Sequence, residues 1–396
     1  MSATQASAAR PGFAAVLADL GLEAGSAGAP GGTALVALDA RLAGLSELRA
    51  RARDAAADGW LLVHVAGAPS DADLARVRDA AWPDWHASAV YRDARGVLER
   101  RTLEGRASLA GSLEPAGAVL ALRRRAAVLA PSATVAKFDR NAAGWNGEPG
   151  RPGYAHFRWM RRFVADLAGP HRARRILDFG CGAGWVGIEA ALAAVARGGA
   201  PELAFFDPSP EMVRIAESNA RAAGLARLVG RTGFGEEPPF PGPGEAPYDL
   251  VLSSGVVSFA RDREAWFDGL ARAVLEGGTL VIGDIHPGSK GMARRRREKP
   301  LLPIREMNGM RREEARAELE RRGFRFECWS GYQLTDPVPQ WNHLDATRLG
   351  GALGPALLAW NRRAAARSLA RGGADQDRFD SWAMRLVRAS AHARRE

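Results

Sequence analysis

Residues 175–185 read Arg-Ile-Leu-Asp-Phe-Gly-Cys-Gly-Ala-Gly-Trp, and this stretch decides the fold. It predicts a short buried strand that ends at Asp178, then a turn with three glycines, then a helix over 189–196. Because glycine has no Cβ, such a turn lets the backbone lie close against a bound molecule. The order of strand, glycine turn and helix is typical of an α/β sheet that binds a nucleotide-like ligand.

Two kinds of ligand fit this turn. Gly182-Ala-Gly184-Trp-Val-Gly187 matches the G-x-G-x-x-G of a dinucleotide site, where a pyrophosphate lies over the turn and the helix N-terminus. The carboxylate of Asp178 would repel that pyrophosphate, but it would attract a ligand with a cationic end, directly or through water. Asp178 therefore favours a cationic ligand, and an NAD(P)-dependent oxidoreductase is the alternative.

Further strand–helix pairs follow the turn. Strands are predicted at 203–207, 248–254 and 277–284, with a helix that opens at Pro208 and another at 261–275. This order predicts a parallel sheet with helices on both faces, in which ligands bind at the carboxyl ends of the strands. The polar residues at these ends are Asp178, Asp207, Ser253 and Asp284.

Asp207 is the second acidic candidate. It lies 25 residues after Gly182, close to the spacing at which a strand-end carboxylate binds both hydroxyls of a ribose. The ribose role is favoured, and the alternative is a structural role as the N-cap of the helix that opens at Pro208. The two roles are compatible.

Residues 134–288 resemble the class I S-adenosylmethionine (SAM)-dependent methyltransferases. Residues 178–184 match their D-x-G-x-G-x-G motif, residues 205–212 match the acidic loop after the second strand, and residues 248–257 match the fourth motif. The resemblance implies a seven-stranded Rossmann-like sheet, SAM as cofactor and methyl transfer by in-line displacement. The cofactor-binding residues that it implies in these motifs are Asp178, Gly180, Cys181, Gly182, Gly184, Asp207, Pro208, Met212, Ser253 and Ser254.

Two flanking segments extend the resemblance. Residues 137–146 resemble the "F-D-x-x-A-x-x-W-D" entry helix of ubiquinone-biosynthesis-type O-methyltransferases, in which this helix and the next one cover SAM; this assigns Trp145 and Tyr154 to the cofactor. The acid that binds the adenine amino group in the family has no counterpart after the third strand. Adenine is expected instead at backbone groups near Thr232 and Gly233 and against Phe234.

Composition narrows the class of protein. With 396 residues, 46% hydrophobic and 25% charged, the chain is long enough for two globular domains. It has neither a signal-peptide pattern nor an apolar run of about 20 residues, so no membrane association is expected. Of its two cysteines, Cys181 lies in the glycine turn, which favours the reducing cytoplasm.

The net charge of +10 has two explanations. A basic chain can bind nucleic acid or an acidic substrate, but only three of its 55 basic residues are Lys, which indicates a compositional bias toward Arg. No nucleic-acid-binding motif is recognised, so no nucleic acid is expected as a partner. The dense run Arg294–Arg297 is interpreted either as a contact for an anionic acceptor or as a solvated helix face.

The chain is expected to have three parts: a flexible segment at 1–32, an accessory α/β domain at 33–130, and a methyltransferase domain at 134–396. The accessory part reads strand, helix, strand, helix, hairpin, strand, which resembles the C-terminal half of the methyltransferase fold without a glycine turn. One hypothesis is a truncated, non-catalytic half used for homodimerisation or for covering the active site. The other is an unrelated accessory domain.

The acceptor site is expected after Asp284. An insertion at about 335–378 carries aromatic residues and predicts a lid or an apolar acceptor pocket. Because a hydroxyl acceptor profits from a base of near-neutral pKa, His286 is the first catalytic candidate and His343 the second. The predicted reaction is methylation of a small molecule, on oxygen in preference to nitrogen. No cluster has metal-ligand spacing, so no metal is predicted. A non-catalytic SAM-fold regulatory or assembly subunit is a further alternative.

Overall fold

The computed structural model describes residues 11–22, 34–38, 45–54, 59–94, 97–113, 116–146, 162–169, 171–237, 241–332, 360, 363, 367, 370 and 379–390. It divides into two compact units. The first unit consists of Met1–Ala133 together with Arg294–Met307. The second unit consists of Thr134–Ala293 together with Asn308–Glu396.

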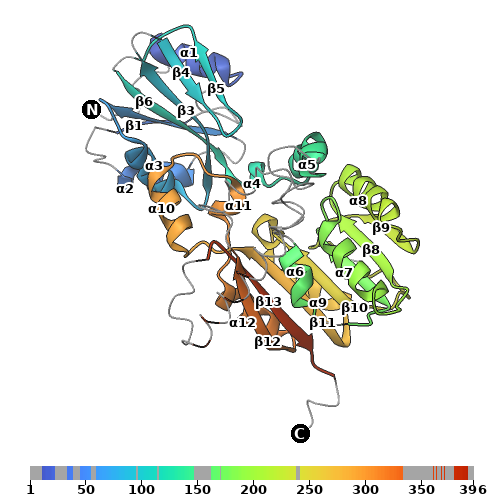
Figure 1. The fold of residues 1–396 in the computed structure, drawn as a ribbon. Helices are drawn as coiled ribbons and strands as arrows, with labels where there is room; N and C mark the ends of the chain where they lie inside the picture. The colour runs from blue at the N-terminus through green and yellow to red at the C-terminus, as the bar shows by residue number, and fades with distance from the viewer. Residues whose placement is uncertain are drawn as a thin grey trace. The chain divides into compact units, whose positions relative to one another are not determined.

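The second unit is built on a seven-stranded sheet with the order β12-β13-β11-β10-β7-β8-β9 (Figure 1). The strands are β7 (Arg175–Phe179), β8 (Glu202–Asp207), β9 (Leu228–Thr232), β10 (Tyr248–Ser254), β11 (Val274–Ile285), β12 (Phe324–Tyr332) and β13 (Ser381–Arg388). Strands β7 to β11 pair in parallel, and β13 runs antiparallel to both β11 and β12. This confirms the predicted Rossmann-like sheet.

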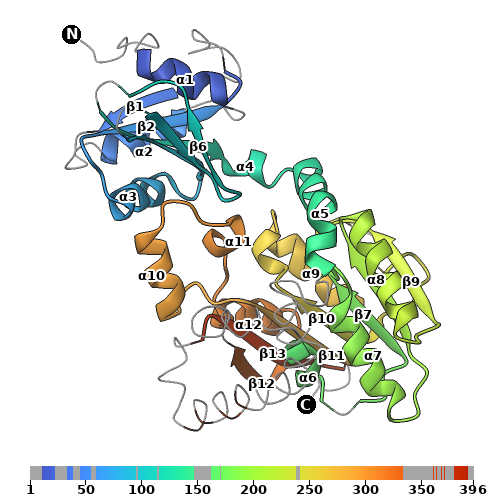
Figure 2. The ribbon, with the colours of Figure 1, turned by 45° about the horizontal axis from the view of Figure 1, so that its top comes forward.

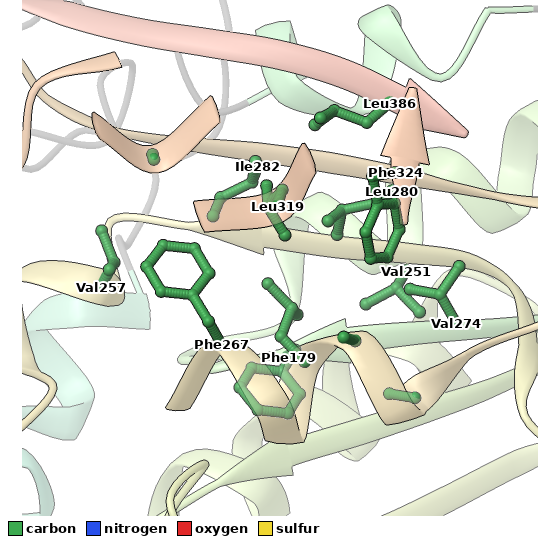
Figure 3. Close-up of a cluster of buried hydrophobic side chains, with 14 of the residues drawn as sticks. Phe179, Val251, Val257, Phe267, Val274, Leu280, Ile282, Leu319, Phe324 and Leu386 are labelled. Atoms are coloured by element: carbon green, nitrogen blue, oxygen red, sulfur yellow. The ribbon is translucent and has the colours of Figure 1, made fainter. Parts of the chain in front are cut away.

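Helices cover both faces of this sheet. They are α6 (Arg162–Leu167), α7 (Trp185–Val195), α8 (Pro210–Ala222), α9 (Arg263–Ala273) and α12 (Arg312–Arg321). Helix α5 (Pro131–Asn146) precedes them in the sequence, and a short 3₁₀ turn η3 (Val257–Phe259) follows β10. Phe267 of α9 and Leu319 of α12 pack on one face, where Figure 3 shows them beside Ile282 of β11. Residues of α6, α7 and α8 pack on the other face.

The central strands are apolar on both sides because both sides are covered. In β10, Val251 belongs to the core under α9 and α12, whereas Leu250 and Leu252 belong to the core under α6 and α7. A strand buried on both faces reads as a continuous hydrophobic run, which is how the sequence of β10 could be recognised. The polar residues are thus left to the strand ends.

The first unit contains a six-stranded sheet with the order β1-β2-β6-β3-β4-β5, which confirms an additional N-terminal α/β unit. Its strands are β1 (Ala34–Leu38), β2 (Trp60–Ala66), β3 (Trp85–Ala94), β4 (Val97–Arg101), β5 (Arg106–Leu109) and β6 (Gly117–Arg124). Its helices include α1 (Pro11–Asp19), α2 (Leu45–Asp54), α3 (Asp71–Ala81) and α4 (Arg125–Val128). Helix α1 covers one face of the sheet, and α2 and α3 cover the other (Figure 2).

Residues 294–307 belong to the first unit although the methyltransferase-like segments surround them in the sequence. This stretch carries most of α10 (Lys290–Glu298) and the short α11 (Ile304–Met307). The fully buried Arg78 of α3 donates to the carbonyl oxygens of Arg296, at 2.6 Å, and Lys299. Carbonyls at a helix C-terminus lack partners inside the helix, so the guanidinium caps α10.

Two arginines of the basic run at 294–297 form ion pairs in this arrangement. Arg295 pairs with Glu306 at 3.0 Å, and Arg296 pairs with Asp79 at 3.2 Å. Both pairs lie inside the first unit. The Arg296 pair joins the segment to α3, whereas the Arg295 pair lies within the segment and joins α10 to α11. Neither role was among the interpretations of the run made from the sequence.

The N-terminal segment also differs from the sequence expectation. Residues 11–19, expected within a flexible stretch, form α1, because Val16 and Leu17 are buried against the sheet of the first unit. The glycine-rich residues 25–32 lie outside the described residues, as does most of the insertion expected at about 335–378. Among the helices described, none combines the length and apolarity that crossing a bilayer would require.

Candidate functional site

The glycine turn lies between β7 and α7, at the carboxyl end of the parallel strands. Gly180 and Cys181 both donate their N–H to the carbonyl of Phe206, at 2.7 and 3.0 Å. Gly184 caps α7 with a φ of 82°, and an added Cβ there would lie 2.8 Å from Cβ of Ala216. A side chain at this position would be strained and would collide with α8, so the sequence needs glycine.

Gly182 lies at the open side of the turn. A Cβ added there would meet no atom within 4 Å, in contrast to Gly180, where it would come within 2.3 Å of Val256. The backbone at Gly182 therefore borders free space at the carboxyl end of the sheet. This is the place where a bound molecule can lie directly on the main chain.

Asp207 ends β8 beside this open turn. Its Oδ2 accepts from the N–H of Gly182 at 2.9 Å, and its Oδ1 accepts from the N–H of Ser209 at 3.0 Å. Two carboxylate oxygens have about four lone-pair sites, so acceptor capacity remains after these two bonds. The N-cap of α8 is Ser209 and not Asp207, so the capping role suggested from the sequence belongs to the nearby serine. Asp207 keeps the strand-end position from which the sequence suggested that it binds vicinal hydroxyls.

Burial changes the acidity of Asp207 and of its neighbour. Burial, together with the Asp139 carboxylate, raises the pKa of Asp207 to about 6, against the opposing effect of the Ser209 and Gly182 amides. Burial and the charges of Asp207 and Asp178 raise the pKa of the Cys181 thiol well above its usual value. Cys181 is therefore a neutral thiol and not a nucleophile.

The Asp178 side chain, which the sequence placed toward the cationic end of a ligand, contacts the protein backbone instead. Its Oδ2 accepts from the N–H of Gly187 in α7 at 2.8 Å, and a Cβ at Gly187 would lie 2.9 Å from that oxygen. The carboxylate thus joins the end of β7 to the first turn of the helix. A direct role in attracting the cationic end of a ligand is not needed to explain the residue.

Helix α5 is attached to the acidic loop after β8. Ser209 Oγ donates to the carboxylate of Asp139 and accepts from the N–H of Met212. Ala142 of α5 packs with the buried Met212. The motif residue Asp139 could have been assigned this role from the entry-helix pattern, but its partner could not, because Ser209 is 70 residues away. Pro208 is half-buried in the same loop.

The C-terminal end of α5 has a second attachment. Trp185 Nε1 donates to the carbonyl of Asn146 at 2.9 Å, and Asn219 Nδ2 donates to the Asn146 side-chain oxygen at 2.8 Å. The end of α5 is thereby held to both α7 and α8. Tyr154 and the side chain of Trp145, both expected at the cofactor, lie outside the described residues.

The segment after β9 lies next to Asp207. Thr232 pairs with Asp207 in the β8–β9 ladder, and the N–H of Gly233 donates to the Asp207 carbonyl at 3.2 Å. The Arg261 guanidinium lies 4.9 Å from the Phe234 ring centre. Arg261 was not singled out from the sequence, since a lone Arg before a helix carries no signal.

The polar ends of β10 and β11 hold neighbouring loops. Ser253 Oγ donates to the Phe179 carbonyl at 2.9 Å, which joins β10 to β7. The buried Asp284 accepts from the N–H of Ser258 at 2.9 Å and of Ile285 at 2.7 Å. Ser254 is also buried. The structure thus gives Ser253 and Asp284 tethering contacts that an argument from strand ends alone did not foresee.

His286 follows β11 in the loop that leads to α10. Its N–H donates to the Asp380 carbonyl at 2.8 Å, which fixes the backbone. A Cβ added at Gly288 would lie 3.2 Å from His286 Cε1 and 3.7 Å from Arg311 Cζ, so both side chains border Gly288. Burial raises the pKa of Glu313, but its backbone amide, Arg312 and His286 outweigh this and lower the pKa overall. The second candidate base, His343, lies outside the described residues.

The residues brought together at this edge fit a nucleoside with vicinal hydroxyls. The open backbone at Gly182 offers a surface for it, and Asp207 keeps acceptor capacity beside that surface. Phe234 offers an aromatic ring beyond the next strand. The contacts described at the turn include no cationic side chain, and the Asp207 carboxylate beside it would repel a pyrophosphate.

Comparison with known proteins supplies the family. Residues 154–328 match a family described as a methyltransferase domain. No curated protein matches the chain.

Several solved structures resemble it at low identity. One is the N-methyltransferase NodS from Bradyrhizobium japonicum WM9 in complex with S-adenosyl-L-homocysteine, with 12% identity, covering 65% of this chain and 99% of that one at a TM-score of 0.41. Another is described as StiE O-MT residues 961–1257, with 16% identity, 60% and 76% coverage and a TM-score of 0.39. The [4+2]-cyclase SpnF has 18% identity, 65% and 93% coverage and a TM-score of 0.41. Such low scores carry no information about substrate. With the family match over the glycine turn and both strand-end acids, residues 154–328 form a SAM-dependent methyltransferase domain, and SAM is its cofactor.

Proposed function

We propose that this enzyme methylates a small-molecule acceptor on a hydroxyl oxygen, with a nitrogen nucleophile as the second choice, and that His286 takes the acceptor proton. The observation that carries this proposal is the position of His286 at the end of β11, one strand from β10 and two from the glycine turn on β7. A hydroxyl attacks a methyl group far better once its proton is removed.

The cofactor is expected on the residues around the turn. The backbone at Gly180, Cys181, Gly182 and Gly184 would lie along its amino-acid part, and Asp207 would accept from its ribose hydroxyls. Thr232, Gly233 and Phe234 would border the adenine. When bound there, SAM supplies a methyl carbon that is transferred in line with a neutral thioether as the leaving group.

The chain's own residues then have two tasks. They hold the acceptor oxygen in line with the methyl carbon, and they remove the proton of the hydroxyl as the new carbon–oxygen bond forms. The proton moves to a nitrogen of the His286 imidazole. Glu313, whose carboxylate interacts electrostatically with His286, favours the protonated ring that results.

The test uses the full chain, SAM and a panel of phenols, catechols and amines, with release of S-adenosylhomocysteine as the signal. For the acceptor that turns over, His286→Asn is expected to lower kcat by about 100-fold, because a positioned base contributes about 100- to 10,000-fold. The affinity for SAM, measured by calorimetry, should stay within about twofold of wild type, because β11, which His286 follows, lies two strands from the glycine turn on β7.

His171→Asn is the matched control. His171 precedes β7 and so lies at the opposite, amino-terminal end of the parallel strands. It should leave both turnover and SAM affinity unchanged. If His286→Asn reduces kcat less than threefold, His286 is not the base; if only amines are methylated, the acceptor atom is nitrogen.

The expected setting of the enzyme belongs to the same proposal. Cys181 and Cys328 are free thiols in the structure, which supports a reducing, cytoplasmic compartment. We expect no nucleic acid as partner, since two arginines of the densest basic run are paired inside the first unit.

A further inference from the structure

We infer that the first unit is a half-sheet copied from the methyltransferase fold, and that its open edge makes the chain a dimer by pairing β1 with β1 of a second copy. The reasoning begins with strand order. In the second unit the last four strands lie in the order β10-β11-β13-β12. In the first unit β1-β2-β6-β3 has the same order.

The directions of these strands agree as well. The pairs β10–β11 and β1–β2 are parallel, whereas the pairs that involve β13 and β6 are all antiparallel. In both units a helix separates the first two strands of the set and another directly precedes the third. The additional strands β4 and β5 lie between β3 and β6, at the point where the second unit has its insertion between β12 and β13.

The register agrees residue by residue. Across β11, β13 and β12 one row contains Leu280, Leu386 and Phe326. The matching row across β2, β6 and β3 contains Leu61, Leu122 and Ala87. Immediately after this row both outer strands skip one residue, Glu327 in β12 and Ser88 in β3, and each of them is the fourth residue of its strand. A bulge at the same position of the same strand is a specific feature of a fold.

The loop after the second strand is the same length in both units. The N–H of His286 donates to the carbonyl of Asp380, six residues before Leu386, and the N–H of Gly67 donates to Ala116, six residues before Leu122. Three residues later a serine caps the next helix. Ser289 Oγ accepts from the N–H of Met292 at 3.0 Å, and Ser70 Oγ accepts from the N–H of Asp73 at 3.2 Å.

The copied half lacks the neighbour that the complete sheet has. In the second unit β10 pairs on its outer side with β7, through Leu250–Leu252 and Ile176–Asp178. The equivalent strand β1 ends its sheet, with no partner on that side among the strands that the structure describes. The sequence of β1 is Ala-Leu-Val-Ala-Leu, which has no charge and no proline.

Such an edge needs a partner strand. Soluble proteins guard an edge strand with Lys, Pro or a bulge, and an apolar edge without them is a template for pairing with another chain. The partner with a matching edge in every preparation is a second copy of this chain. Two identical edges pair about a two-fold axis, which gives a closed dimer and one continuous sheet.

The experiment measures the mass of the full chain by sedimentation velocity and tests it with a pair of prolines. Of two successive residues in a strand, one has its N–H directed to β2 and the other to the open edge. Leu35→Pro and Val36→Pro therefore differ: one disturbs the β1–β2 ladder, and the other removes only a bond across the open edge. We expect a wild-type dimer and one folded, monomeric proline variant.

Single cysteine variants of β1 detect the same dimer by disulfide cross-linking, even if both proline variants fail to fold. Cysteine placed singly at Leu35, Val36 and Ala37 should give a disulfide-linked dimer for the position at the two-fold axis, since facing residues in antiparallel strands have Cα atoms about 4.5–5.5 Å apart. Val63→Cys, on the neighbouring interior strand, is the matched control and should not cross-link. A monomeric wild type, a folded proline variant that stays dimeric, or the absence of any cross-link at these three positions overturns the inference.

Discussion

The sheets of the two units share an arrangement of four strands but differ at the strand ends. At equivalent places in the register the second unit has polar residues and the first has apolar residues or glycine: Ser253 against Val36, Ser254 against Ala37, Asp284 against Val65, and His286 against Gly67. The strand order, the register and the bulge thus form without any polar group at these ends. The four strands therefore do not need the polar residues at the strand ends of the second unit in order to fold.

The contacts separate these polar groups into two kinds. Ser253 joins β10 to β7, which has no counterpart among the strands described in the first unit, and Asp284 holds the loop that contains Ser258. These two side chains attach parts that only a complete methyltransferase has. The backbone bond of His286 to Asp380 has its counterpart in the bond of Gly67 to Ala116, so this bond requires no particular side chain. The backbone contact therefore does not explain why the second unit has a histidine here.

The largest effect is expected when end residues are exchanged between the units. Val65 is fully buried in an apolar core, so Val65→Asp must bury an unpaired carboxylate and should lower the free energy of unfolding of the first unit by about 4 kcal/mol or more. Asp284→Val leaves two buried N–H groups without an acceptor and should cost about 2–4 kcal/mol in the second unit.

Denaturant unfolding of the full chain measures both changes. Val65→Ile and Asp284→Asn are the conservative controls, and each should lose clearly less stability than its exchange variant. If Asp284→Val were as stable as wild type, the tethering role of Asp284 would be refuted and a role toward the ligand would be favoured.

An intermediate effect is expected from pH, and only the second unit should respond through Asp207. Its folded pKa is about 6, above the ordinary value of 3.8. A protonated carboxyl accepts poorly from ribose hydroxyls, so SAM affinity should fall about tenfold for each pH unit below 6. Calorimetry between pH 5 and 7.5 measures this slope, and Asp207→Asn should bind weakly and with no slope in that range.

The same shift has the opposite sign for the stability of the ligand-free protein. Because folding raises the pKa of Asp207, its contribution to stability is fully present below pH 3.8 and is lost as pH rises through about 6. Asp207→Asn should therefore stabilise the free protein at pH 7.5 relative to wild type while weakening SAM. A variant that loses stability at pH 7.5 would show that the bonds from Gly182 and Ser209 matter more than the buried charge.

The smallest effect is expected at the matched helix caps. Ser70→Ala and Ser289→Ala each remove a side-chain acceptor from a helix N-terminus and should cost about 1 kcal/mol. Ser289→Ala should cost the larger amount, because Ser289 Oγ also donates to the buried Asp380 at 2.9 Å. Threonine at either position should restore most of the loss, and shifts in the unfolding midpoint measure all four variants.

The sequence was sufficient for the elements of the methyltransferase sheet. Strands such as β10 are continuous apolar runs, and the glycine turn specifies a conformation that few other residues adopt, so both leave local signals. The functions of Asp178 and Asp284 could not be predicted, because a carboxylate at a strand end looks the same whether it faces a ligand or an N–H of the protein. That difference depends on the loop that packs over it.

Contacts between residues far apart in the sequence could not be predicted either. The placement of residues 294–307 depends on Arg78, which precedes its acceptors Arg296 and Lys299 by more than 200 residues. Nothing in a run of arginines indicates that one of its carbonyls will be capped by a guanidinium from another helix. Helix α1 was missed for a related reason, since an Ala-rich stretch reads as flexible until the sheet that buries Val16 is known.

The position of residues 294–307 has a consequence for biosynthesis. As the chain leaves the ribosome, the first 133 residues emerge without the piece that completes their unit. At that stage the Arg78 guanidinium lacks the carbonyl acceptors of Arg296 and Lys299. The hydrophobic core of the first unit also lacks Leu301. The first unit can finish folding only after Met307 has been synthesised, by which time the glycine turn and most of the parallel strands are already outside. The second unit needs β12 and β13, which follow Met307 in the sequence, so it is completed later still and both units finish folding only late in synthesis.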